Sequence, residues 1–159
     1  MGESREKTAC FTGHRELSLF QIPFIKRKLK KALEELIENG YLYFGAGGAL
    51  GFDTLAAQAV LELRKKYSQI KLILVLPCKT QADRWPEADK EEYESIKNQA
   101  DKVVYTSEEY TSDCMFKRNR HLVDYSSICI CYLNKDSGGT AYTVNYARSR
   151  GLEIINIAD

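Results

Sequence analysis

The stretch of sequence that decides the fold is "YFGAGGALGFDTLAAQAV", residues 43–60. An apolar, aromatic run leads into four glycines, and an alanine-rich run of helical character follows them. Glycines placed between a strand and a helix are typical of a turn whose backbone N–H groups approach an anion. The stretch therefore predicts a strand, a phosphate-binding turn and a helix in succession, and a purely structural turn is the alternative.

The spacing of these glycines differs from the two common nucleotide-binding motifs. Gly45 and Gly47 fit the dinucleotide motif G-x-G-x-x-G, but Leu50 stands where its third glycine belongs. The stretch follows the second predicted strand rather than the first, and "LPCKT" rather than an acidic residue follows the next strand. A G-K-[ST] sequence is also missing, so both a standard NAD site and a P-loop are disfavoured.

Six short β-rich runs alternate with helical segments on both sides of this stretch. Most of the runs are continuously apolar, which is typical of strands that are covered on both faces of a sheet. The runs span residues 7–12, 41–46, 70–77, 102–107, 127–134 and 152–158. The helical segments span residues 17–39, 53–66, 86–100, 112–125 and 139–150. The alternation predicts one domain over residues 1–159, an α/β fold with a doubly wound, mostly parallel sheet and helices on both faces.

Composition argues against several classes of function. The formal net charge of the 159 residues is +1, so no global basic field attracts nucleic acid. No apolar run is long enough to cross a bilayer, and the N-terminus has no apolar signal-peptide region. The five cysteines contain no C-x-x-C pair, and Cys129 and Cys131 alternate on one face of a predicted strand. These features predict a cytoplasmic protein with no membrane partner and no metal site.

In doubly wound sheets the ligand lies at the carboxyl ends of the strands, so the residues after each strand are the candidates. "TGHR" follows the first strand, where Gly13 permits a sharp turn and His14 and Arg15 project at the crevice mouth. Arg15 can pair with a phosphate or carboxylate, and a solvated loop arginine is the alternative. Gly138-Gly139-Thr140 opens a helix after the fifth strand and is a second candidate anion-binding turn.

Other candidate residues lie in the loops and helices between these turns. Asp53 serves either as the N-cap of the helix that follows the first glycine turn or as a contact to a ligand hydroxyl. Arg118 and Arg120 lie in the helix predicted over residues 112–125 and bring two guanidinium groups near the strand that leads to the Gly138-Gly139 pair, and an ordinary surface face is the alternative. Trp85 ends the loop "PCKTQADRW", where it either stacks on a base or packs the loop onto the domain.

Taken in order, "TGHR", "GAGGALGFDTLAA", "RNR" and "SGGTAYTVNYA" resemble the motif series of the SLOG superfamily, which contains the Smf/DprA and LOG groups. "CFTGHR", "LPCKTQADRW" and "KRNRHLVDYS" resemble the small YpsA-like bacterial family, and the likeness covers residues 8–158. The resemblance implies a Rossmann-like sheet, and it implies homodimers, which are frequent in the superfamily. It also implies a nucleotide pocket formed by Gly13, Arg15, Gly47, Gly48, Asp53, Arg118, Arg120, Gly138, Gly139 and Thr140.

This sequence departs from the superfamily patterns at residues that distinguish the known functions of the superfamily. LOG enzymes cleave an N-glycosidic bond and carry P-G-G-x-G-T-x-x-E, but Ser137 replaces the proline here and Thr143 replaces the glutamate. A threonine cannot act as the required carboxylate, and the near-neutral charge weakens a likeness to the DprA proteins, which load single-stranded DNA.

The sequence therefore favours a cytoplasmic binding or sensor protein for a nucleotide derivative that contains phosphate and ribose, such as ADP-ribose. A hydrolase or transferase acting on N-glycosides of nucleoside phosphates, with Asp53 or Asp136 as the acid, is one alternative. Single-stranded DNA binding is the other. Whether the protein catalyses a reaction, and with which cofactor, stays open.

Overall fold

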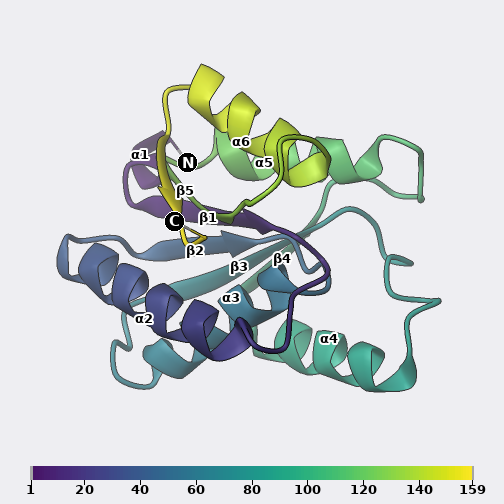
Figure 1. The fold of residues 1–159 in the computed structure, drawn as a ribbon, viewed down its shortest axis with the longest axis horizontal. Coiled ribbons are helices and arrows are strands. Elements are labelled where there is room, and N and C mark those ends of the chain that lie inside the picture. Colours follow the sequence, from purple (N-terminus) through teal and green to yellow (C-terminus); the bar gives the residue numbers. More distant parts are fainter. Residues whose placement is uncertain (1, 159) are drawn as a thin grey trace.

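The structure, a computed structural model, describes residues 2–158 and is built around one parallel sheet (Figure 1). Its strand order is β4-β3-β2-β1-β5-β6, and every neighbouring pair is parallel. The strands are β1 (Thr8–Gly13), β2 (Tyr43–Ala46), β3 (Lys71–Leu76), β4 (Lys102–Tyr105), β5 (Ile128–Tyr132) and β6 (Glu153–Asn156). All six predicted strands are present, and the predicted Rossmann-like α/β fold is confirmed.

Helices cover both faces of the sheet, as predicted. One layer holds α2 (Ile22–Glu38), α3 (Phe52–Arg64) and α4 (Glu87–Gln99), and the other holds α5 (Cys114–Asp124) and α6 (Gly139–Ser149) (Figure 1). A short helix that the sequence pattern did not predict, α1 (Gly2–Arg5), precedes β1. No helix within residues 2–158 is long and apolar enough to cross a membrane.

The helix predicted from residue 17 begins five residues later. Leu19 and Phe20 are exposed, so their apolar character does not mark a buried helix face. Pro23 lies in the first turn of α2, where its fixed φ suits a helix start and its missing N–H costs no intrahelical hydrogen bond. From there Leu29 and Leu33 point into the core at helical spacing.

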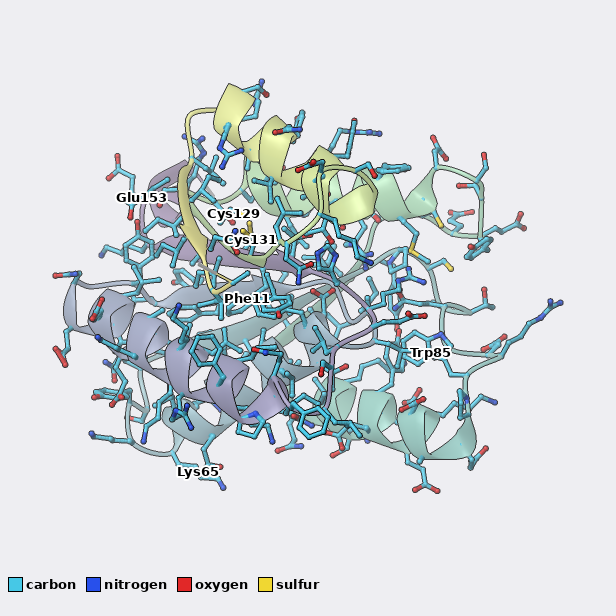
Figure 2. All side chains as sticks on the ribbon, viewed as in Figure 1. Phe11, Lys65, Trp85, Cys129, Cys131 and Glu153 are labelled. Carbon is cyan, nitrogen blue, oxygen red and sulfur yellow. The ribbon has the colours of Figure 1, made fainter. Side chains whose placement is uncertain are left out.

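Alternation along the strands divides the core into two layers. Phe11 on β1 packs in the layer of α2 and α3, while its neighbour Cys10 packs in the layer of α5 and α6. Cys10 lies opposite Cys129 in the parallel register, and Cys131 shares their layer (Figure 2). The prediction that Cys129 and Cys131 point to one face is confirmed, and both are fully buried.

The order of the strands reverses between β1 and β5. The chain proceeds from β1 through β4 toward one edge of the sheet and then returns to place β5 on the other side of β1. At such a switch point the loops after the two central strands diverge and leave a crevice at their carboxyl ends. The loops in question are the "TGHR" loop after β1 and the "NKDSGG" loop after β5.

Candidate functional site

A cavity of about 290 Å³, here called the switch-point cavity, occupies this crevice. Its walls come from the loop after β1, the start of α3, the first turns of α5, and the loop that leads into α6. Eight of the eleven residues that the sequence singled out line it: Gly13, His14, Arg15, Asp53, Arg118, Gly138, Gly139 and Thr140. The fold therefore gathers into one cavity residues that are spread over more than a hundred positions of the sequence.

The other three candidates lie outside the walls of the cavity. The carbonyl of Gly47 accepts a hydrogen bond from Nη1 of Arg118, and a Cβ at Gly47 would lie 2.8 Å from that nitrogen. Gly48 has a φ of +71°, and a Cβ there would overlap the side chain of Leu76 behind the turn. Arg120 donates from Nη1 to the Tyr142 hydroxyl, 3.2 Å away, at an exposed position.

The glycines of the opening stretch bring two segments of backbone together. Gly51 has a φ of +78°, and a Cβ there would overlap the carbonyl group of Arg15. The next residue, Phe52, donates its N–H to the carbonyl of His14 over 3.1 Å, and its ring fills the space where a Cβ of Gly13 would lie. This close contact fixes the "TGHR" loop against the start of α3 and so places Arg15 at the cavity.

Asp53 and Arg118 form the buried, charged floor of the cavity. The carboxylate Oδ2 of Asp53 accepts the N–H of Ala49 over 3.2 Å, and the side chain of Arg118 contacts the Gly47 carbonyl. Burial raises the pKa of Asp53, and the charge of Arg118 and the Ala49 N–H partly offset that rise. Burial lowers the pKa of Arg118, and the charge of Asp53 partly offsets that fall.

A chain of hydrogen bonds joins this floor to the start of α6. Nε of Arg118 donates to Oδ1 of Asn119 over 2.6 Å, and Nδ2 of Asn119 donates to Oγ1 of Thr143 over 3.0 Å. The same Thr143 hydroxyl donates to the carbonyl of Gly139 over 2.9 Å. We call Arg118, Asn119 and Thr143 the α5–α6 relay, because they hold the two helices in register beside the cavity.

The relay explains why Thr143 is not a cavity residue. Its side chain is 3% exposed and both of its hydroxyl roles are used inside the protein. The Thr143 hydroxyl, at the position where the resemblance to LOG enzymes implies a glutamate, is therefore a structural group. Sequence reasoning noted the replacement, but it had no signal for the partner of Thr143, since Asn119 lies on another helix.

The N-terminus of α6 is open toward the cavity. Gly138 precedes the helix with a φ of +100° and a ψ of −177°, and no side chain caps the helix. Apart from the chain neighbours of each glycine and the backbone of α6 itself, no atom of the described residues lies within 4 Å of the position that a Cβ would take at Gly138 or Gly139. The first N–H groups of a helix have no intrahelical acceptor and carry its positive dipole end, so this opening favours a negatively charged group.

The charged side chains around the opening are mostly positive, like the N-terminal end of the α6 dipole. Arg15, Arg118 and Lys135 line the cavity, against the single carboxylate of Asp53. Burial lowers the pKa of His14, with a smaller contribution from the charge of Lys135, and Nε2 of His14 accepts the N–H of Asn134 over 3.1 Å. Lys135 was not among the sequence candidates, although it lies in the loop that was quoted for its glycines.

The loop after β3 stays outside the cavity. Trp85 packs edge-on against Tyr93 in α4, with their ring centroids 5.2 Å apart. The sequence left two alternatives for Trp85, stacking on a base and packing the loop onto the domain, and the structure shows the packing. Within residues 2–158 no group of three or more His, Cys, Asp or Glu side chains is placed to hold a metal ion.

Comparison with known proteins gives a consistent family and fold. The model of the YpsA family, described as "YspA SLOG family", matches residues 9–153. A UPF0398 protein of Bacillus pumilus is 33% identical over 153 residues, which cover 90% of this chain and 82% of that protein.

Two solved structures of DNA processing protein A (DprA) share the fold. The protein from Streptococcus pneumoniae superposes with a TM-score of 0.68 at 20% identity, over 95% of this chain and 50% of that chain. The protein from Helicobacter pylori, whose structure concerns single-stranded DNA binding, gives a TM-score of 0.64 at 17% identity over 92% and 63%. This chain thus spans half to two thirds of the length of those DprA proteins.

Proposed function

The chain belongs to the YpsA family of SLOG proteins, and on that premise we propose that it binds a nucleotide or nucleotide derivative in the switch-point cavity. The whole chain acts as a single cytoplasmic domain in this proposal. All five cysteines are buried and none forms a disulfide in the described part of the chain, which supports a reducing compartment.

The observation that carries the proposal is the open N-terminus of α6. Gly139 has no steric reason inside the protein to be glycine, because its surroundings are empty and its φ lies outside the left-handed region. A ligand that approaches the backbone closely supplies such a reason. With the dipole of α6 and the charges of Arg15, Arg118 and Lys135 around it, that ligand is an anion, and a phosphate fits best.

Asp53 supplies the second element of recognition. Its carboxylate lines the same cavity on the α3 side, while its Oδ2 is held by the N–H of Ala49. A ribose hydroxyl is a natural donor to a fixed carboxylate oxygen. The volume of about 290 Å³ is at the lower end of the range for small-molecule sites, so it suits a portion of ligand the size of a mononucleotide.

Isothermal titration calorimetry with AMP, ADP-ribose, NAD and cyclic nucleotides tests the proposal. At least one compound is expected to bind, and Arg15→Ala is expected to weaken that binding by about tenfold, because it removes a charge-assisted contact to phosphate. Arg27→Ala on α2 is the matched control, since Arg27 is also exposed and lies outside the cavity. The absence of binding by every compound would refute the proposal.

Hydrolysis of an N-glycosidic bond is the second candidate function. It is favoured by one observation: a buried carboxyl with a raised pKa, Asp53, lines the cavity, as a general acid would. Release of free base from nucleoside monophosphates, abolished in Asp53→Asn, would establish it. Binding without turnover at high enzyme concentration would support the binding function and exclude the hydrolase.

The structural likeness to DprA also suggests binding of single-stranded DNA. A single-stranded oligonucleotide, added to the same titrations at low salt, tests this binding.

A further inference from the structure

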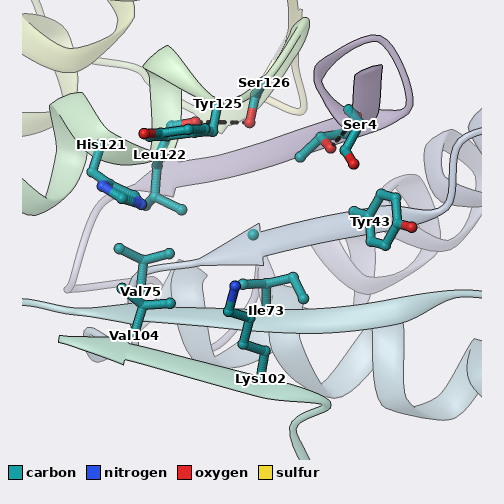
Figure 3. A pocket seen from close by; sticks show the side chains of 12 residues that line it. Ser4, Tyr43, Ile73, Val75, Lys102, Val104, His121, Leu122, Tyr125 and Ser126 are labelled. Carbon is teal, nitrogen blue, oxygen red and sulfur yellow. Dashed lines mark hydrogen bonds between the residues drawn. The ribbon is translucent and has the colours of Figure 1, made fainter. Parts of the chain in front are cut away.

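A second cavity, of about 360 Å³, lies on the sheet (Figure 3). It is separate from the switch-point cavity. It lies beside α5, and its lining residues come from α1, from strands β1 to β4, and from the second half of α5 with the residues that follow it. We call it the sheet-face cavity. The two cavities share no lining residue, and they contact successive turns of α5: Arg118 and Asn119 line the first, and His121 and Leu122 line the second.

The floor of the sheet-face cavity is apolar. Ile73 and Val75 of β3 and Val104 of β4 point into it from the sheet, and Leu122 closes it from α5 (Figure 3). Gly45 of β2 lies beneath Leu122, whose Cδ2 atom takes the space of a missing Cβ. Apolar side chains on one face of a sheet favour an apolar group of a ligand, and an aromatic ring can lie against such a face.

The rim carries the positive charge of Lys102, whereas burial lowers the pKa of His121, so that its imidazole is a neutral hydrogen-bonding group near pH 7. Lys102, the first residue of β4, and His121 of α5 line the cavity, and no Asp or Glu is among its lining residues. The His121 ring contacts the Tyr125 ring, with centroids 4.6 Å apart, which keeps the imidazole at the rim. Hydroxyl groups of Tyr43, Tyr125 and the nearby serines add hydrogen-bonding partners.

We propose that the sheet-face cavity binds a small organic anion with a planar apolar body and one carboxylate. The body lies on Ile73, Val75 and Val104, and the carboxylate lies at the rim beside Lys102 and His121. Charge complementarity selects the anion over a neutral or cationic molecule of the same shape, and the volume is within the range for small-molecule sites. The site is independent of nucleotide binding, so either proposal can fail without the other.

Protein-detected NMR with three indole compounds tests this site. Indole-3-acetate carries the carboxylate, indole-3-acetamide is its neutral counterpart, and tryptamine is a cation of similar shape. Indole-3-acetate is expected to shift the amide signals of Val75, Val104 and Leu122 and to leave those of the switch-point cavity unchanged. It is also expected to bind more tightly than the amide, and tryptamine is expected to bind most weakly.

A pair of lysine variants isolates the role of charge. Lys102→Met keeps the aliphatic stem and is expected to weaken indole-3-acetate binding by about fivefold, while binding of the neutral amide stays the same. Lys71→Met is the matched control, because Lys71 is the exposed first residue of the neighbouring strand β3 and lies outside the cavity. Both lysines are exposed, so both variants are expected to fold.

Three results would overturn the proposal. One is that no compound shifts the signals of the cavity at millimolar concentration. Another is that all three compounds bind equally, which would mean that charge plays no part. The third is that the signals of Val75 and Val104 move with protein concentration alone, which would show that a second copy of the chain covers this face.

Discussion

Gly51 and Gly139 stand at the N-termini of two helices beside the switch-point cavity, but they are glycine for different reasons. At Gly51 the reason lies within the fold, since the backbone turns with a positive φ and meets the carbonyl group of Arg15. At Gly139 the surroundings are empty. A substitution at the first position is expected to disturb the fold, and one at the second is expected to disturb only the binding of the proposed ligand.

Gly139→Ala therefore separates binding from stability. Alanine favours a helix over glycine, so the free energy of unfolding is expected to stay the same or to rise by up to about 1 kcal/mol. The added methyl group stands at the helix N-terminus, and nucleotide affinity is expected to fall by about tenfold or more. Urea denaturation and calorimetry measure the two quantities. If the variant binds the nucleotide as tightly as the parent protein does, the phosphate does not bind at the start of α6.

The burial of Asp53 predicts a pH dependence of stability. Its pKa is raised in the folded state, so the folded protein retains a proton that the unfolded chain releases. From about pH 4 upward, through the raised pKa, ionisation of this buried carboxyl lowers the free energy of unfolding. Asp53→Asn cannot ionise, so its stability is expected to gain on that of the parent as the pH rises through this range.

The measurement is urea denaturation of both proteins at a series of pH values. The loss of the charge partner of Arg118 changes the free energy of unfolding by the same amount at every pH, so the prediction concerns only how the difference between the two proteins changes with pH. A difference that stays constant over the whole range would show that the carboxyl titrates at its ordinary value.

At the scale of elements, α5 is the helix on which both proposed sites depend. Its first turns contribute Arg118 and Asn119 to the switch-point cavity, and its later turns contribute His121 and Leu122 to the sheet-face cavity. The α5–α6 relay holds α5 to its neighbour through the buried hydroxyl of Thr143. The position of the open end of α6 is therefore set by hydrogen bonds that come from α5.

Thr143→Val tests that coupling. Valine keeps the shape but removes the hydroxyl, which leaves Nδ2 of Asn119 without its acceptor in a partly buried place. The free energy of unfolding is expected to fall by about 1–2 kcal/mol. Thr143→Ser retains the hydroxyl and serves as the control, since it is expected to preserve the hydrogen bonds. Equal losses in both variants would mean that packing of the methyl group, rather than the relay, stabilises the contact.

How much of the structure the sequence can predict depends on how far apart the contacting residues lie in the chain. Strands and glycine turns depend on neighbouring residues, so their positions could be predicted, and the switch point then brings the candidates of two loops together. The side chain that occupies the space beside Gly47 belongs to Arg118, 71 residues later, and no local pattern encodes that contact. For the same reason the sequence could not show that Gly47 and Gly48 lie outside the lining of the switch-point cavity.

At the scale of the whole molecule, stability depends on the core between the sheet and the layer of α2, α3 and α4. Leu33 is fully buried in that layer, whereas Leu19, in the loop before α2, is 81% exposed. Leu33→Ala is expected to lower the free energy of unfolding by about 3 kcal/mol, since it removes buried methyl groups and leaves a cavity. Leu19→Ala is expected to change it by less than about 0.5 kcal/mol. Similar losses in both variants, measured by urea denaturation, would contradict the assignment of this core.

All five cysteines are buried, so the reactivity of each thiol reports how often the structure around it opens. Cys10, Cys129 and Cys131 lie in the core beneath α5 and α6, while Cys78 is buried in the loop after β3 and Cys114 is buried at the start of α5. A thiol reagent reaches a buried sulfur only when the structure around it opens, so the modification rate of each cysteine measures how often its region opens. The three cysteines of the sheet are expected to react together and most slowly, at the rate of global unfolding. Cys78 and Cys114 would then show how often the loop after β3 and the start of α5 open on their own.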